Sequence, residues 1–208
     1  DGYTILTIQK TPSKMRLSDY LTSFVAEIGV TDVFSVTGGG SMHMVDSFGS
    51  FEKINFVPTH HEQAAAYAAE GYARISGKPG VAVLTTGPGG TNAISGVYGA
   101  WVDSIPIIFL AGQVQRHQMI GNTGLRQYGV QESDMVSLVK SITKYSAVVD
   151  DPNMIKYHLQ KALHFATSGR PGPVWLDVPL DVQGKIISVP ELTSFIPDME
   201  EEKHTFTA

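Results

Sequence analysis

The sequence predicts an α/β fold of three layers, α/β/α, around a central and mainly parallel sheet of about six strands. Short apolar runs such as 81–85 and 105–111 are typical of strands that are buried on both faces. These runs alternate with segments whose apolar residues follow helical spacing, which is the order expected of β-α-β units. Glycine-rich stretches directly follow two of the predicted strands, at the edge where parallel sheets bind ligands.

The first part of the chain predicts a helix, a strand and a second helix. Apolar residues from Leu17 to Ile28 follow helical spacing, and Gly29 ends that helix. The short apolar segment 32–36 predicts a strand that runs directly into a glycine loop, 37–40. A second helix is expected from about residue 41.

The next part centres on an alanine-rich helix. The apolar segment 54–57 predicts a strand, and the helix begins at Glu62. A turn over 77–80, which contains glycine and proline, separates this helix from the next strand. The continuous apolar run 81–85 predicts a buried parallel strand, and it leads into a loop over 86–92.

The second half repeats the alternation. A helix is predicted over 93–102 and a buried strand over 105–111. The polar, glycine-containing stretch 113–131 has no assignable periodicity. Three further elements follow: a strand over 142–149, a helix over 153–167 and a last strand over 174–178 that Pro179 stops.

Composition predicts one globular domain with short extensions. Residues 1–14 are interpreted as a tail, 15–185 as the domain, and 186–208 as a linker or tail toward a middle domain outside this chain. A net charge of −5 disfavours nucleic acid as a partner. No apolar run approaches the roughly 20 residues that cross a membrane. The absence of cysteine excludes disulfides and fits a cytoplasmic location.

Glu62 is the first candidate for chemistry. It stands where strand 54–57 gives way to a helix of small apolar residues, so we expect its carboxyl group to be partly withdrawn from water. A carboxyl group in a dry pocket can hold and release a proton. The alternative is an ordinary acid at a helix start, favoured there by the helix dipole.

The other motifs are weak when each is taken alone. The loop 86–92 lacks the Gly-Lys-Ser/Thr ending of a phosphate-binding loop, and 37–41 lacks the three spaced glycines of a dinucleotide fold. Either loop could be a plain strand-to-helix turn. The pair His60-His61 lacks the second histidine that a zinc-protease helix needs four residues on, so no metal site is predicted. No Gly-x-Ser-x-Gly elbow supports a serine nucleophile.

In combination, the motifs resemble thiamin-diphosphate enzymes of the acetolactate synthase family, over about residues 17–183. The segments that carry the resemblance are His61–Ala65, Glu70–Arg74, Gly77–Val81, Thr86–Asn92, Ser141–Lys144, Ala166–Val174 and Leu176–Pro179. The resemblance implies the N-terminal, pyrimidine-binding domain of such an enzyme. It departs from the usual pattern at the first glycine loop, 37–40, and at 121–129, which is longer than expected.

The resemblance also implies a role for each candidate residue. Glu62 matches the catalytic glutamate that hydrogen-bonds N1′ of the cofactor's aminopyrimidine and helps to activate the cofactor toward a 2-oxo acid. The other implied cofactor-binding residues are Gly38, Gly39, Gly40, Thr86, Pro88 and Asn92. Gln131 matches a glutamine that approaches substrate, and Val130 stands where acetolactate synthases usually have phenylalanine. The smaller side chain would leave more room for the substrate.

Further parts of the enzyme are implied outside this chain. In the family, Mg²⁺ and the diphosphate are held by a C-terminal domain with a Gly-Asp-Gly motif, which is absent from this sequence. FAD, where present, sits in the middle domain. We therefore expect a homodimer or homotetramer of a longer carboligase or lyase, with this chain inactive alone. The alternatives are a binding or regulatory module without catalysis, and a family member that acts in a sugar pathway.

Overall fold

The computed structural model describes residues 12–197. Most of the tail predicted over 1–14, and residues 198–208 of the predicted linker, lie outside the described residues. A sheet of six parallel strands forms the middle layer, in the order β3-β2-β4-β5-β7-β6. The strands are β2 (Asp32–Ser35), β3 (Asn55–Pro58), β4 (Gly80–Leu84), β5 (Ile107–Gln113), β6 (Tyr145–Val148) and β7 (Val174–Pro179). The predicted fold class is confirmed.

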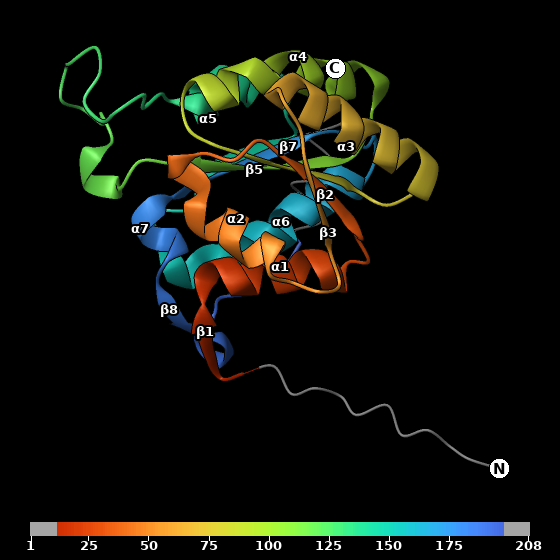
Figure 1. Ribbon diagram of the computed structural model, residues 1–208, viewed down its shortest axis with the longest axis horizontal. Helices are drawn as coiled ribbons and strands as arrows, with labels where there is room; N and C mark the ends of the chain where they lie inside the picture. Colours follow the sequence, from red (N-terminus) through yellow and green to blue (C-terminus); the bar gives the residue numbers. More distant parts are fainter. Residues whose placement is uncertain (1–11, 198–208) are drawn as a thin grey trace.

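Helices cover both faces of this sheet (Figure 1). On one face lie α3 (Glu62–Ser76), α4 (Pro88–Asp103) and α5 (Met135–Val139). On the other lie α1 (Leu17–Glu27), α2 (Met42–Gly49) and α6 (Ile155–Thr167), with the short α7 (Leu180–Gln183) near the sheet edge. Each face therefore has its own hydrophobic core, as the three-layer prediction requires.

The central strands divide their side chains between the two cores. Val81 and Val83 of β4 pack with α1, α2 and α6, whereas Ala82 and Leu84 pack with α3, α4 and α5. Because side chains alternate along a strand, a strand buried on both faces has no polar side to show. This alternation explains why β4 and β5 appear in the sequence as continuous apolar runs.

The start of α4 differs from the prediction. The helix begins at Pro88 rather than at residue 93, so most of the predicted loop 86–92 is helical. Proline suits the first helical position because its fixed φ is already helical and its missing N–H would have no partner there. Gly89 serves close packing instead of a turn, since a Cβ would lie 2.5 Å from Thr85 Cγ2, and a Cβ at Gly90 would lie 3.0 Å from the flexible side chain of Met135.

Two smaller differences concern the second half. The strand predicted over 142–149 is β6 and begins only at Tyr145, because Lys140–Ile142 forms a 3₁₀ turn. The helix predicted over 153–167 likewise starts as a 3₁₀ turn, Pro152–Met154. Outside the main sheet, β1 (Lys14–Arg16) pairs antiparallel with β8 (Ile186–Ser188). Both strands lie at the predicted domain boundaries, after residue 14 and after residue 185.

Candidate functional site

Glu62 is the first residue of α3 and lies at the carboxyl edge of the sheet, just after β3. The preceding His61 caps the helix, because its Nδ1 accepts a hydrogen bond from the backbone N–H of Gln63 at 3.1 Å. The Glu62 side chain is only 8% exposed. Asn92 Nδ2 donates a hydrogen bond to Glu62 Oε2 at 2.9 Å. The other oxygen, Oε1, accepts no hydrogen bond from any residue in the described range 12–197.

Close helix packing brings Glu62 and Asn92 together. Their helices, α3 and α4, run side by side, and a Cβ at Gly96 would lie only 2.4 Å from Ala66 Cβ. The start of α4 also leaves space next to the carboxyl group. A Cβ at Gly89 would lie 3.3 Å from Glu62 Oε1, so glycine keeps that oxygen accessible from this side.

The first glycine loop packs against the end of β4. Gly40 N donates a hydrogen bond to Thr85 Oγ1 at 3.2 Å, and a Cβ at Gly38 would lie 2.5 Å from Thr85 Cβ. Gly39 has open space around the position of a Cβ. The two glycine loops therefore meet at one edge of the sheet, as expected for loops that follow neighbouring parallel strands.

Thr86 and Pro88 flank the turn into α4. Thr86 is buried, and its hydroxyl group donates to Gln113 Oε1 at 2.6 Å, so this hydroxyl is bound within the protein. Pro88 is exposed at the first position of the helix. Between them, Gly87 has a left-handed φ of +59°.

The segment that holds the substrate candidates crosses this turn. A Cβ at Gly87 would lie 1.9 Å from the carbonyl oxygen of Gln131, so only glycine permits this contact. Gln131 itself has a left-handed φ of 57°. Its neighbour Val130 is 82% exposed in the described chain. The structure thus places Val130 and Gln131 beside the second glycine loop; their roles toward substrate stay predictions.

Two buried polar residues were missed by the sequence analysis. Gln113 ends β5 and Asp177 lies in β7, and each is 1% exposed. Burial raises the pKa of Asp177 to about 7, although hydrogen bonds from Trp175 and Gln113 oppose the rise. Asp134 and Glu132 act in the same direction as burial. A carboxyl group within an otherwise apolar strand was the signal that could have revealed this pair.

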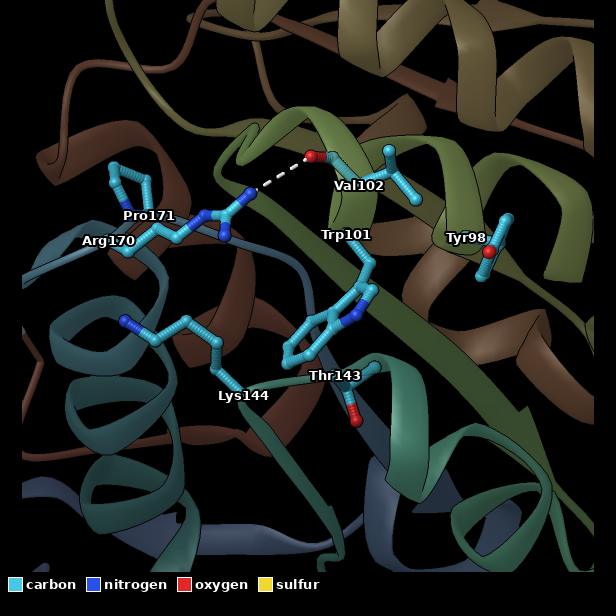
Figure 2. A pocket seen from close by; sticks show the side chains of 7 residues that line it. All are labelled: Tyr98, Trp101, Val102, Thr143, Lys144, Arg170 and Pro171. Carbon is cyan, nitrogen blue, oxygen red and sulfur yellow. Dashed lines mark hydrogen bonds between the residues drawn. The ribbon is translucent and has the colours of Figure 1, made fainter. Parts of the chain in front are cut away.

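A cavity of about 480 Å³ lies at the opposite edge, before β6 and β7 (Figure 2). It is lined by Tyr98, Trp101, Val102, Thr143, Lys144, Arg170 and Pro171. Its two cations bind helix ends. Arg170 Nη2 donates to the carbonyl oxygen of Val102 at 3.1 Å, and Lys144 Nζ donates to that of Ser168 at 2.6 Å. Cations are favoured at helix C-termini, so these side chains have a structural role.

Within 12–197, no group of three acidic or histidine side chains could hold a metal ion. In the same range, no helix is both long and apolar enough to cross a membrane.

The comparisons with known proteins define the class of this chain. Residues 15–138 match the family described as thiamine pyrophosphate enzyme, N-terminal TPP binding domain, and the chain belongs to this family. Its relatives include plant and bacterial acetolactate synthases, so the predicted family is confirmed.

Three relatives show the extent of the similarity. The chain is 43% identical over 169 residues to acetolactate synthase 3, chloroplastic, of Brassica napus, covering 81% of this chain and 25% of the relative. It is 39% identical over 195 residues to the Arabidopsis thaliana chloroplastic enzyme, covering 90% and 28%. It is 38% identical over 165 residues to the large subunit from Lactococcus lactis, covering 79% and 28%. The chain therefore spans about a quarter of the length of these relatives.

Proposed function

We propose that this chain supplies the pyrimidine-binding part of the active site of an acetolactate synthase-like enzyme, which decarboxylates a 2-oxo acid and joins the product to a second molecule. The proposal rests on the Glu62 carboxyl group. Glu62 is 8% exposed, its Oε2 accepts a hydrogen bond from Asn92, and its Oε1 has no hydrogen-bond donor among residues 12–197. This arrangement fits an aminopyrimidine, because Oε1 can meet the protonated or unprotonated ring nitrogen N1′.

Thiamin diphosphate, when bound, supplies the electron sink that decarboxylation of a 2-oxo acid requires. The contribution of Glu62 is to accept and return a proton at Oε1. Asn92 holds the carboxyl group in one orientation by donating to Oε2 at 2.9 Å. Gly89 keeps side-chain atoms away from Oε1, since a Cβ there would lie 3.3 Å from it.

The glycine loop 38–40 would approach the cofactor from the side of β2. Gly39 has open space beside it, so a ligand can come close to the backbone there. Gly38 cannot carry a side chain without displacing Thr85, because a Cβ would lie 2.5 Å from Thr85 Cβ, and Gly40 is held by its hydrogen bond to Thr85 Oγ1. Pro88 is exposed at the start of α4 and would add an apolar contact.

The remaining partners belong to parts outside the described chain. We propose that a C-terminal domain holds the diphosphate and Mg²⁺, and that any FAD is held by a middle domain. A homodimer or homotetramer is supported by the exposed apolar side chains of Tyr67 on α3 and Tyr98 and Trp101 on α4. A cytoplasmic location stays a prediction, because the plant relatives are named as chloroplastic.

The test uses the whole protein and the variant Glu62→Gln. We expect the variant to fold and to lose turnover of a 2-oxo acid by about 10²–10⁴-fold, because the amide cannot carry the proton. Glu70→Gln, two turns further along α3 and paired with Arg74, is the matched control and should keep its activity. Normal turnover by Glu62→Gln would refute the proposal. Tight binding of thiamin diphosphate without any turnover by the wild type would instead support the binding module.

A further inference from the structure

Asp177 is a buried carboxyl group that the proposed function does not use. It lies in β7, and no lysine, arginine or histidine within residues 12–197 forms an ion pair with it. Its two hydrogen bonds come from Trp175 Nε1 to Oδ1 at 2.7 Å and from Gln113 Nε2 to Oδ2 at 3.3 Å. Burying a carboxyl group without a cation is costly. Such a group therefore needs a reason beyond the packing of the core.

The Gln113 amide links Asp177 to the second glycine loop. Its Oε1 accepts hydrogen bonds from Thr86 Oγ1 at 2.6 Å and from Val114 N at 2.9 Å. Its Nε2 donates to Asp177 and to the carbonyl oxygen of Ser133 at 2.9 Å. An amide has two donor hydrogens and two acceptor lone pairs, so all four are used.

Three groups fix the direction of this amide: the N–H of Val114 binds its oxygen, and the carbonyl oxygen of Ser133 and the Asp177 carboxyl group accept its two N–H hydrogens. If the amide were reversed, its NH₂ group would face the N–H of Val114, and its oxygen would face both the carbonyl oxygen of Ser133 and the Asp177 carboxyl group. The direction of the amide in turn makes the Thr86 hydroxyl group the donor. Asp177 is therefore one end of a chain of hydrogen bonds that reaches Thr86 through Gln113, although Asp177 and Thr86 do not bond each other.

The other two partners of the Gln113 side chain, Thr86 and Ser133, lie on either side of the contact between Gly87 and Gln131. Thr86 precedes Gly87, which touches the carbonyl oxygen of Gln131, and Ser133 follows Gln131 by two residues. Gln113 therefore holds both the turn into α4 and the segment that crosses it. The same helix α4 carries Asn92, which binds Glu62.

We propose that Asp177 is a positioning residue: by accepting the second N–H of the Gln113 amide it holds Gln113 in place between the Thr86–Gly87 turn and the Gln131 segment, and so supports the geometry of the cofactor site without touching a ligand. The inference rests on the proposed function, because the site it serves is the one assigned to thiamin diphosphate.

The test measures the dissociation constant of thiamin diphosphate by calorimetry, with Mg²⁺ present, in the whole protein. Asp177→Asn has the same shape but must turn an NH₂ group toward one of its two donors. We expect affinity to fall about tenfold, the equivalent of one hydrogen bond. Thr86→Val should also cost about tenfold. The double variant should lose about tenfold as well, instead of a hundredfold, because both changes break the same chain of bonds.

Trp175→Phe is the matched control. It removes the other donor to Asp177 and loosens the core, while the bond from Asp177 to Gln113 stays. We expect it to lower the urea midpoint and to change affinity by less than about twofold, since it does not alter Gln113. A purely structural role for Asp177 would make Trp175→Phe and Asp177→Asn weaken binding alike, in proportion to their loss of stability.

The remaining outcomes are also decisive. Additive losses in the double variant, or unchanged affinity in Asp177→Asn, would overturn the inference. If Asp177→Asn does not fold, Gln113→Met takes its place in the comparison with Thr86→Val. Methionine has a similar length but lacks both the carbonyl oxygen and the NH₂ group of the Gln113 side chain. A wild-type protein that binds no thiamin diphosphate would refute the proposed function instead, so the two failures can be told apart.

Discussion

The contact between α3 and α4 offers a quantitative test of how the site is assembled. In Gly96→Ala, the new Cβ would lie 2.4 Å from Ala66 Cβ. Carbon atoms pack at about 3.5–4.0 Å, so the helices must separate by roughly 1 Å. Overpacking of this kind costs about 1–3 kcal/mol, whereas replacing glycine with alanine within a helix returns about 1 kcal/mol. We therefore expect a net loss of up to about 2 kcal/mol.

Gly99→Ala on the same helix is the matched control. A Cβ there meets its nearest atom, Glu70 Oε2, at 3.5 Å, which is an ordinary contact. This variant should gain up to about 1 kcal/mol, because only the change in helix propensity acts. Since that term is common to both variants, the difference between them isolates the overpacking, at about 1–3 kcal/mol.

The assay is urea unfolding of both variants, with the free energy of unfolding extrapolated to water. A second change, Ala66→Gly, removes the opposing methyl group. Once the cost of Ala66→Gly alone is subtracted, the two changes should show a favourable coupling energy of about 1–3 kcal/mol, because the overpacking is relieved. Equal stability of Gly96→Ala and Gly99→Ala would refute the reasoning, since it would mean that α3 and α4 are not in contact at this point.

Two further predictions concern single positions. Gly87→Ala should lose more stability to urea than Gly77→Ala, because both have left-handed φ but only Gly87 faces a carbonyl oxygen, 1.9 Å from a Cβ; equal losses would contradict this. Burial lowers the pKa of His158, whose Nδ1 lies 2.6 Å from the Tyr145 hydroxyl, so the folded protein should lose stability as pH falls below about 6.5, where the unfolded chain binds the proton first. His158→Asn keeps an acceptor for Tyr145 but cannot bind the proton, so its urea midpoint should fall less between pH 7 and pH 5 than that of the wild type. If the difference between the two midpoints stays constant over this range, His158 does not cause the loss of stability.

Most of the fold could be predicted because its signals are local. β4 and β5 are continuous apolar runs, and the helices between strands show a regular apolar face. The start of α4 was predicted too late, because Gly89 and Gly90 resemble a loop when their packing partners are unknown. The pairing of β1 with β8 was not predicted, since each strand has three residues and the partners lie far apart in the sequence.

The candidate site was predictable only in outline. The rule that parallel strands gather their following loops at one edge placed Glu62 near both glycine loops. The bond from Asn92 to Glu62 joins residues 30 positions apart, and Gln113 bonds Thr86, Ser133 and Asp177, each 20 or more positions away. Such bonds depend on the register of the sheet and on helix rotation, and neither is written in a local pattern.

The pairing of β1 with β8 also bears on how the domain responds to force. Lys14 lies opposite Ser188, and Arg16 lies opposite Ile186. Tension applied outward at Lys14 and Ser188 would break the hydrogen bonds between β1 and β8 one pair after another instead of all at once. The two-stranded sheet of β1 and β8 should therefore separate at a low pulling force, well before the strands of the six-stranded sheet separate.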